Sequence, residues 1–69
     1  MEIRSFNNLI DCFNHRRFVR LNGLITKETE LAIQVTMDYG FIKWFPKSKT
    51  IYINSINAYF VEKWLLKDS

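Results

Sequence analysis

The residues that could carry out covalent or acid–base chemistry in this chain are few. Cys12 and His15 are its only cysteine and histidine, and their spacing of three would place a nucleophile and a base on one face of a helix. No third residue is indicated to orient the pair, so we interpret Cys12 as a small core or interface residue and His15 as part of a basic surface. The nearest carboxylates, Glu28 and Glu30, are predicted to lie in a solvated loop.

Cofactor and metal sites also lack the residues that they need. Two glycines cannot form a phosphate-cradling loop, and no group of residues has metal-ligand spacing. A single cysteine cannot close an internal disulfide, which favours a reduced, cytoplasmic location. We also expect no signal peptide and no membrane span, because no window approaches the roughly 18 consecutive apolar residues that a span requires. The sequence therefore predicts a protein that is not an enzyme and that uses no cofactor and no metal.

Residues suited to binding are better represented. Ten Lys and Arg oppose seven Asp and Glu, and the basic residues gather at 15–20 and 43–49. Most of the aromatic residues lie between Tyr39 and Val61, a stretch with three lysines and no carboxylate. Lys and Arg can contact phosphates, and aromatic rings can stack on bases. The residues predicted to form a binding surface are Arg16, Arg17, Arg20, Phe41, Lys43, Phe45, Lys47, Lys49 and Tyr52.

The elements that must position these residues begin with a predicted helix. A chain of 69 residues can form one domain, which we place at 1–69, with an economical core. Apolar residues at 3, 6, 9, 10 and 13 predict a helix over residues 5–14, with Ser5 as its N-cap. From residue 17 the period changes to two, which predicts a strand that Gly23 either bends or, with Asn22, interrupts by a tight hairpin turn. We favour the bend, because a hairpin would leave very short strands.

A meander of strands is predicted to follow. Alternation from Leu31 to Met37 indicates a strand, residues 38–40 a turn, and residues 41–45 an antiparallel return that Pro46 ends. Residues 50–53 and 58–61 are two further predicted strands, and a short helix follows them. The fold class is therefore predicted as α+β: an N-terminal helix, a strongly bent antiparallel sheet of four or five strands or a small SH3-like or OB-like barrel, and a short C-terminal helix.

The two faces of the sheet are assigned from the same periodicity. Ile42 and Trp44 are predicted to point inward, and Trp64 joins them in the core. Phe41, Phe45 and Tyr52 then form an outer stripe beside Lys43, Lys47 and Lys49. The face of the N-terminal helix formed by Phe6, Leu9, Ile10 and Phe13 either covers this stripe, which makes it a second core layer, or packs elsewhere and leaves the stripe exposed for binding.

Several segments together resemble a known group of sequences. They are residues 29–33 (Thr-Glu-Leu-Ala-Ile), 38–40 (Asp-Tyr-Gly), 44–48 (Trp-Phe-Pro-Lys-Ser) and 64–65 (Trp-Leu). Over roughly residues 19–66 the chain is similar to small, largely uncharacterised phage and bacterial proteins with a Glu-Thr-Glu and Trp-aliphatic-Pro-Lys-Ser core, in which Phe45 occupies an aliphatic position. The resemblance implies a compact β-rich domain of mobile-element origin and brings no activity, cofactor or catalytic residue.

Three functions remain open on this basis. The first is a binding protein that docks by a basic and aromatic surface onto nucleic acid or a nucleoprotein complex. The second is a phage-encoded inhibitor, such as an anti-CRISPR, that occupies the surface of a larger host protein in the host cytoplasm. The third is a homo-oligomeric structural module joined through a sheet edge.

Overall fold

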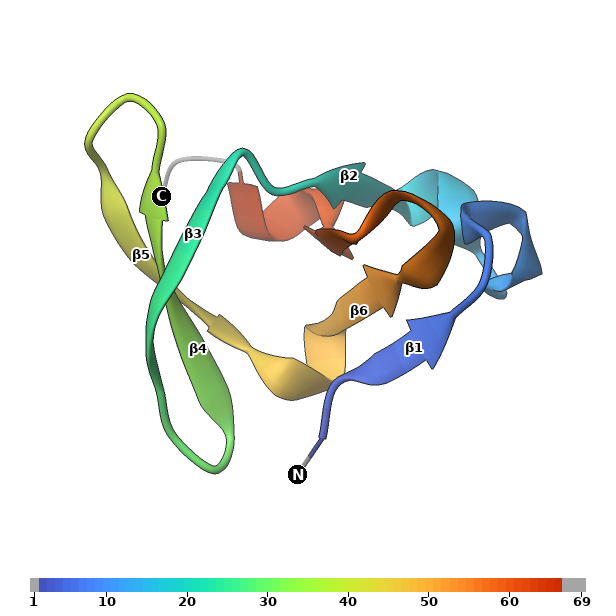
Figure 1. The fold of residues 1–69 in the computed structure, drawn as a ribbon, viewed down its shortest axis with the longest axis horizontal. Helices are drawn as coiled ribbons and strands as arrows, with labels where there is room; N and C mark the ends of the chain where they lie inside the picture. Colours follow the sequence, from blue (N-terminus) through green and yellow to red (C-terminus); the bar gives the residue numbers. More distant parts are fainter. Residues whose placement is uncertain (1, 67–69) are drawn as a thin grey trace.

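A computed structural model describes residues 2–66, which form a mostly β fold of two sheets (Figure 1). The four-stranded sheet has the spatial order β1 (Arg4–Phe6), β6 (Thr50–Ile53), β7 (Ala58–Glu62) and β2 (Phe18–Arg20). The three-stranded sheet is the meander β3 (Gly23–Glu28), β4 (Ala32–Met37) and β5 (Ile42–Pro46). Within the described residues only the β1–β6 pair is parallel. The connections contain the 3₁₀ turns η1 (Leu9–Asp11), η2 (His15–Arg17), η3 (Lys47–Lys49), η4 (Asn54–Ile56) and η5 (Lys63–Leu66).

The main core lies between the two sheets. Ile33, Val35 and Met37 alternate along β4 and are all buried, so the strand predicted from residues 31–37 is confirmed, although Leu31 itself is exposed. These three side chains pack with Phe45 of β5 and Val61 of β7. The main core is therefore enclosed between one face of each sheet.

A second core layer covers the opposite face of the four-stranded sheet. Its buried residues include Ile51 and Ile53 of β6 and Phe60 of β7, and Phe6 and Leu9 pack against them. The segment that contains η1 and η2 thus lies against the four-stranded sheet. Both faces of that sheet are covered, whereas the outer face of the three-stranded sheet has no layer over it in residues 2–66.

The predicted N-terminal helix over residues 5–14 is wrong. Ser5 lies in β1, where it pairs with Tyr52, and η1 and η2 follow as separate single turns. Phe6, Leu9 and Cys12 pack inward with a spacing of three, which is the period of a 3₁₀ turn, while Ile10 and Phe13 are 73% and 86% exposed. Spacings of three and four were consistent with an α-helix, but only the spacing of three is used for packing.

The predicted C-terminal helix and the α+β class are wrong as well. The chain after β7 forms the 3₁₀ turn η5, and no α-helix occurs within residues 2–66. Leu65 and Leu66 pack against the main core, whereas Trp64, predicted to be buried, is 54% exposed. A single 3₁₀ turn after β7 lets Leu65 reach the core while Trp64 stays outside.

Gly23 marks the point at which the chain passes from one sheet to the other. Strand β2 pairs with β7 and strand β3 pairs with β4, so the alternative hairpin is not formed. The single bent strand that we predicted is instead two strands in different sheets, and the β-bulge lies between Ile25 and Lys27. A Cβ atom at Gly23 would lie 2.4 Å from the backbone oxygen of Thr36, which leaves room for no side chain. Glycine therefore allows β3 to start in close contact with β4.

The faces predicted for β5 are inverted. Phe45 is fully buried opposite Ile33, whereas Trp44 and Ile42 are 45% and 61% exposed. The turn after β4 sets this outcome, since it pairs Thr36 with Ile42 and thereby places Ile42 on the outer face with Thr36. Trp44 therefore does not belong to the core, and Phe45 does not belong to an outer stripe.

Candidate functional site

The pairing of β2 with β7 brings two basic segments together. Phe18 pairs with Glu62 in this antiparallel ladder, so the residues just before β2 lie beside those just after β7. Arg16 and Arg17 of η2 consequently meet Lys63 and Trp64 of η5 and line one cleft, which we call the basic cleft. Within residues 2–66 no carboxylate lies at ion-pair distance from these three cations.

Trp64 is held in this cleft by a neighbouring carboxylate. Its indole Nε1 donates a hydrogen bond of 2.8 Å to Glu62 Oε1. The other carboxylate oxygen of Glu62 lies 3.8 Å from the ammonium group of Lys49. These contacts orient an indole ring that remains half exposed beside three cations, which is the arrangement that base stacking next to a phosphate requires.

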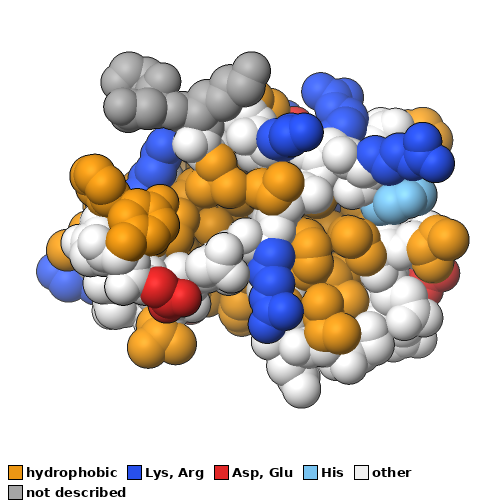
Figure 2. Space-filling view, turned by 90° about the horizontal axis from the view of Figure 1, so that it is seen from above, with side chains coloured by type: hydrophobic (Ala, Val, Ile, Leu, Met, Phe, Trp, Pro, Cys, Tyr) orange, Lys and Arg blue, Asp and Glu red, His pale blue; other side chains and the backbone are white. Residues whose placement is uncertain are grey.

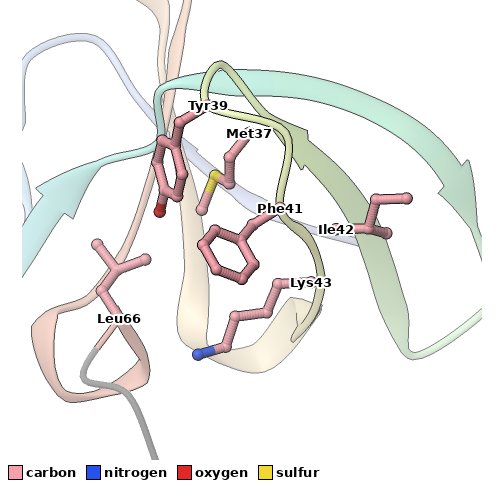
Figure 3. A pocket seen from close by; sticks show the side chains of 6 residues that line it. All are labelled: Met37, Tyr39, Phe41, Ile42, Lys43 and Leu66. Carbon is pink, nitrogen blue, oxygen red and sulfur yellow. The ribbon is translucent and has the colours of Figure 1, made fainter.

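A second hollow lies between the β4–β5 hairpin and η5 (Figure 3). We call it the hairpin pocket; its volume is about 250 Å³, and it is lined by Met37, Tyr39, Phe41, Ile42, Lys43 and Leu66. The rings of Tyr39 and Phe41 meet edge to face with their centroids 5.3 Å apart. Both rings are about 70% exposed. The pocket thus combines exposed aromatic rings with one ammonium group.

Basic and apolar side chains are interspersed on one face of the molecule. Figure 2 shows Lys and Arg side chains among hydrophobic ones on the face seen from above, with few acidic side chains visible. The basic cleft and the hairpin pocket both contact η5, through Trp64 and Leu66 respectively. This turn therefore connects the two hollows.

The predicted binding residues divide into two groups. Arg16, Arg17, Arg20, Phe41 and Lys49 are exposed, and Lys43 is half-buried with its ammonium nitrogen 5.9 Å from the centre of the Phe45 ring. Of these residues, the arginines of η2 line the basic cleft, and Phe41 and Lys43 line the hairpin pocket.

The other predicted residues serve the fold. Phe45 is in the main core, and Lys47 is 6% exposed with its ammonium group paired to the carboxylate of Glu28. Tyr52 is half-buried, packs against Tyr59 with ring centroids 4.8 Å apart, and donates a 2.8 Å hydrogen bond to Asn57 Oδ1. The predicted stripe of Phe41, Phe45 and Tyr52 is therefore not assembled.

Sequence reasoning missed Lys63, Trp64 and Tyr39 as surface residues of these hollows. The register of β2 against β7 puts Lys63 and Trp64 beside the arginines. No pattern in the sequence predicts the register of two strands so far apart in the chain. The exposure of Tyr39 follows from its position in the turn, which the Asp-Tyr-Gly triplet did indicate.

A largely apolar surface remains on the outer face of the three-stranded sheet. Leu24, Thr36 and Ile42 form a row across its three strands, and Lys27, Gln34 and Trp44 form the next row, in which Lys27 is charged. Leu24 is 75% exposed, so this uncovered sheet face presents apolar side chains to solvent.

The hydrogen bond of the Cys12 thiol goes to the backbone and not to His15. Cys12 is buried and its thiol donates to the carbonyl oxygen of Phe13 at 3.3 Å. Burial raises the pKa of the Cys12 thiol, and the charge of Arg4 opposes that shift. A thiol that is kept protonated and enclosed is a poor nucleophile. In the part of the chain that is described, no group of three potential metal ligands lies together, and no helix is long and apolar enough to cross a bilayer.

Comparisons of the chain with protein-family models, with curated protein sequences and with solved structures give no match.

Proposed function

We propose that this protein binds nucleic acid through the basic cleft, without acting as an enzyme. The observation that supports this proposal best is the convergence of Arg16, Arg17 and Lys63 on one half-exposed indole ring. Guanidinium groups suit phosphate because their planar fork donates two parallel hydrogen bonds, and no carboxylate of residues 2–66 lies at ion-pair distance from these two arginines.

Electrostatics give this interface a measurable signature. Arg20 is exposed at the far end of β2, outside the cleft, and supplies a fourth cation for a longer strand of nucleic acid. Each neutralised phosphate contributes about 0.7 to 0.9 to the logarithmic salt slope, so four contacts give a slope of roughly −3. Affinity should then fall by about 50- to 150-fold between 50 and 200 mM salt.

The proposal is tested by fluorescence anisotropy with labelled oligonucleotides over that salt range. Replacing Arg16 and Arg17 by Gln should reduce the slope by about 1.4 to 1.8 and weaken binding at low salt. Lys27→Gln is the matched control, because Lys27 is exposed on β3 and lines neither hollow. Binding that is indifferent to salt, or equal losses in the control and the double variant, would contradict the assignment of the cleft.

Protein binding through the uncovered sheet face is a second candidate. The exposed side chains of Leu24, Ile42 and Trp44 lie on one face, where Lys27 is the charged residue in the row of Trp44. Aromatic and aliphatic anchors of this kind supply most of the energy in protein interfaces. An inhibitor that occupies the surface of a larger protein would use this face and not the arginines.

This second candidate is tested by affinity purification of the tagged protein after nuclease treatment. A protein inhibitor should retain a stoichiometric partner, and Trp44→Ala should release it while Arg16→Gln should not. Self-association in sedimentation experiments would instead identify a second copy of the chain as the occupant. Loss of every retained protein after nuclease treatment would favour the nucleic-acid binder.

A further inference from the structure

We infer that the nucleic acid is single-stranded, with unpaired bases stacked on Trp64 and at the Tyr39–Phe41 pair. This inference rests on the proposed function and adds the hairpin pocket to the basic cleft as a second contact. In this arrangement one nucleic-acid strand crosses η5 and reaches from the basic cleft to the hairpin pocket.

The hairpin pocket fits a flat aromatic group next to an anion. Met37 and Leu66 provide apolar walls, the rings of Tyr39 and Phe41 stand edge to face at an interplanar angle of 72°, and Lys43 contributes an ammonium group (Figure 3). Its volume of about 250 Å³ is below the range of drug-sized ligand sites and suits a group the size of a single base. Asp38 lies in the same turn but does not line the pocket.

The turn η5 contributes a residue to each of the two hollows. Trp64 lines the basic cleft and Leu66 lines the hairpin pocket, two residues further along the same turn. A 3₁₀ turn rises about 2 Å and rotates about 120° per residue, so the two side chains are separated by about 4 Å along its axis and leave it in different directions. A flexible strand that bends around η5 can therefore place nucleotides in both hollows.

The exposure of the rings favours unpaired bases over a duplex. Tyr39, Phe41 and Trp64 present 71%, 68% and 54% of their surface to solvent, and stacking needs a free base face. In a duplex those faces are already stacked on neighbouring base pairs, so extrusion of a base would cost a few kcal/mol. The described residues also contain no α-helix to enter a major groove.

Affinity measurements with matched single strands and duplexes of one sequence test the inference. At 50 mM salt the single strand should bind at least tenfold more tightly than the duplex. Tyr39→Ala, Phe41→Ala and Trp64→Ala should each weaken single-strand binding by about five- to 150-fold, since stacking on one base is worth about 1 to 3 kcal/mol. Leu24→Ala is the control, because Leu24 is an equally exposed apolar residue on the uncovered sheet face.

Intrinsic fluorescence gives a second readout that reports stacking directly. The Trp44→Phe variant keeps Trp64 as its only tryptophan, and its emission should be quenched on addition of a single strand. The reverse variant, Trp64→Phe, keeps Trp44, and its emission should not change.

The outcomes separate this inference from the proposed function. Equal affinity for duplex and single strand, or single-strand binding without quenching of Trp64, would overturn the inference while the basic cleft remains a nucleic-acid site. Absence of binding to both forms at low salt would overturn the proposed function as well.

Discussion

Phe45 is buried and Trp44 is exposed on β5, so truncation of these two neighbouring residues should affect the stability of the fold very differently. Phe45→Ala removes a fully buried ring that packs with Ile33 and Val35 in the main core. Trp44→Ala removes a larger ring that lies 45% exposed on the uncovered sheet face. The larger side chain should therefore be the less important one for folding.

The magnitudes follow from these environments. Truncation of a buried Phe costs about 3 to 5 kcal/mol. A chain of 69 residues has a total free energy of unfolding of roughly 3 to 10 kcal/mol, so Phe45→Ala should leave a marginally folded or unfolded protein. For Trp44→Ala we expect a loss of about 1 kcal/mol, the span of strand propensity scales, which corresponds to a decrease in Tm of about 4 to 8 °C.

Circular dichroism during thermal and urea unfolding measures both variants against the wild type. Phe45→Leu adds an intermediate step, because it retains an apolar side chain at the buried position. If Trp44→Ala abolishes the folded signal while Phe45→Ala melts like the wild type, the hairpin register described above is wrong.

Three further predictions concern single positions. Gly23→Ala should lower the free energy of unfolding by at least about 1 to 3 kcal/mol, because the new Cβ would collide with the backbone of Thr36. The midpoint of urea unfolding measures this loss, and an unchanged midpoint would refute the close contact. Lys47→Met should be nearly neutral in chemical denaturation, whereas Glu28→Gln, which leaves a buried ammonium without its carboxylate, should cost about 1 to 3 kcal/mol; the reverse order would contradict the pairing. Burial raises the pKa of Cys12 in the folded state, so the folded state loses stability as pH rises above the ordinary cysteine pKa of about 8.5 and keeps it below that pH. The Cys12→Ala variant should therefore lose less stability than the wild type between pH 8 and 10. Identical losses in the two proteins would contradict the raised pKa.

The strands after residue 17 could be predicted from the sequence by local signals, whereas β1 was assigned to the predicted helix. Period-two alternation identified β4, and the turn at residues 38–40 identified the β4–β5 hairpin, in which Gly40 has a φ of +96°. Strands β6 and β7 were also correctly placed, with Ile51 and Ile53 inward and Tyr52 half-buried. These features depend on residues close together in the chain.

The faces of β5 were within reach of the same reasoning. With Met37 buried on β4 and Thr36 on the outer face, the pairing of Thr36 with Ile42 places Ile42 and Trp44 outside as well. The error came from assigning the faces by periodicity alone, which groups Ile42 with Trp44 but does not say which face they share, instead of carrying the register through the turn. A strand whose two faces are both apolar gives no other guide.

The N-terminal segment could not be resolved from its pattern alone. Apolar residues recur there at spacings of both three and four, which an amphipathic α-helix and a series of 3₁₀ turns share over so short a stretch. Asn7, Asn8 and Asn14 disfavour a continuous helix, and the positive φ of 62° at Asn14 separates η1 from η2. Packing on the four-stranded sheet decides between these possibilities, and that sheet is completed only by β6 and β7.

The topology explains why the proposed binding residues come from turns and not from strands. Both faces of the four-stranded sheet are buried, so a cation within its central strands would be buried without water, at high cost. The free face of the three-stranded sheet carries one cation, Lys27, in the row of Gln34 and Trp44. The cations and exposed rings of the two hollows come mainly from segments that flank the strands: η2 before β2, η5 after β7, and the hairpin before β5. Because η5 lies at both hollows, a change in the register of β2 against β7 would move Arg16 and Arg17 relative to Trp64, so the binding geometry depends on one strand pair.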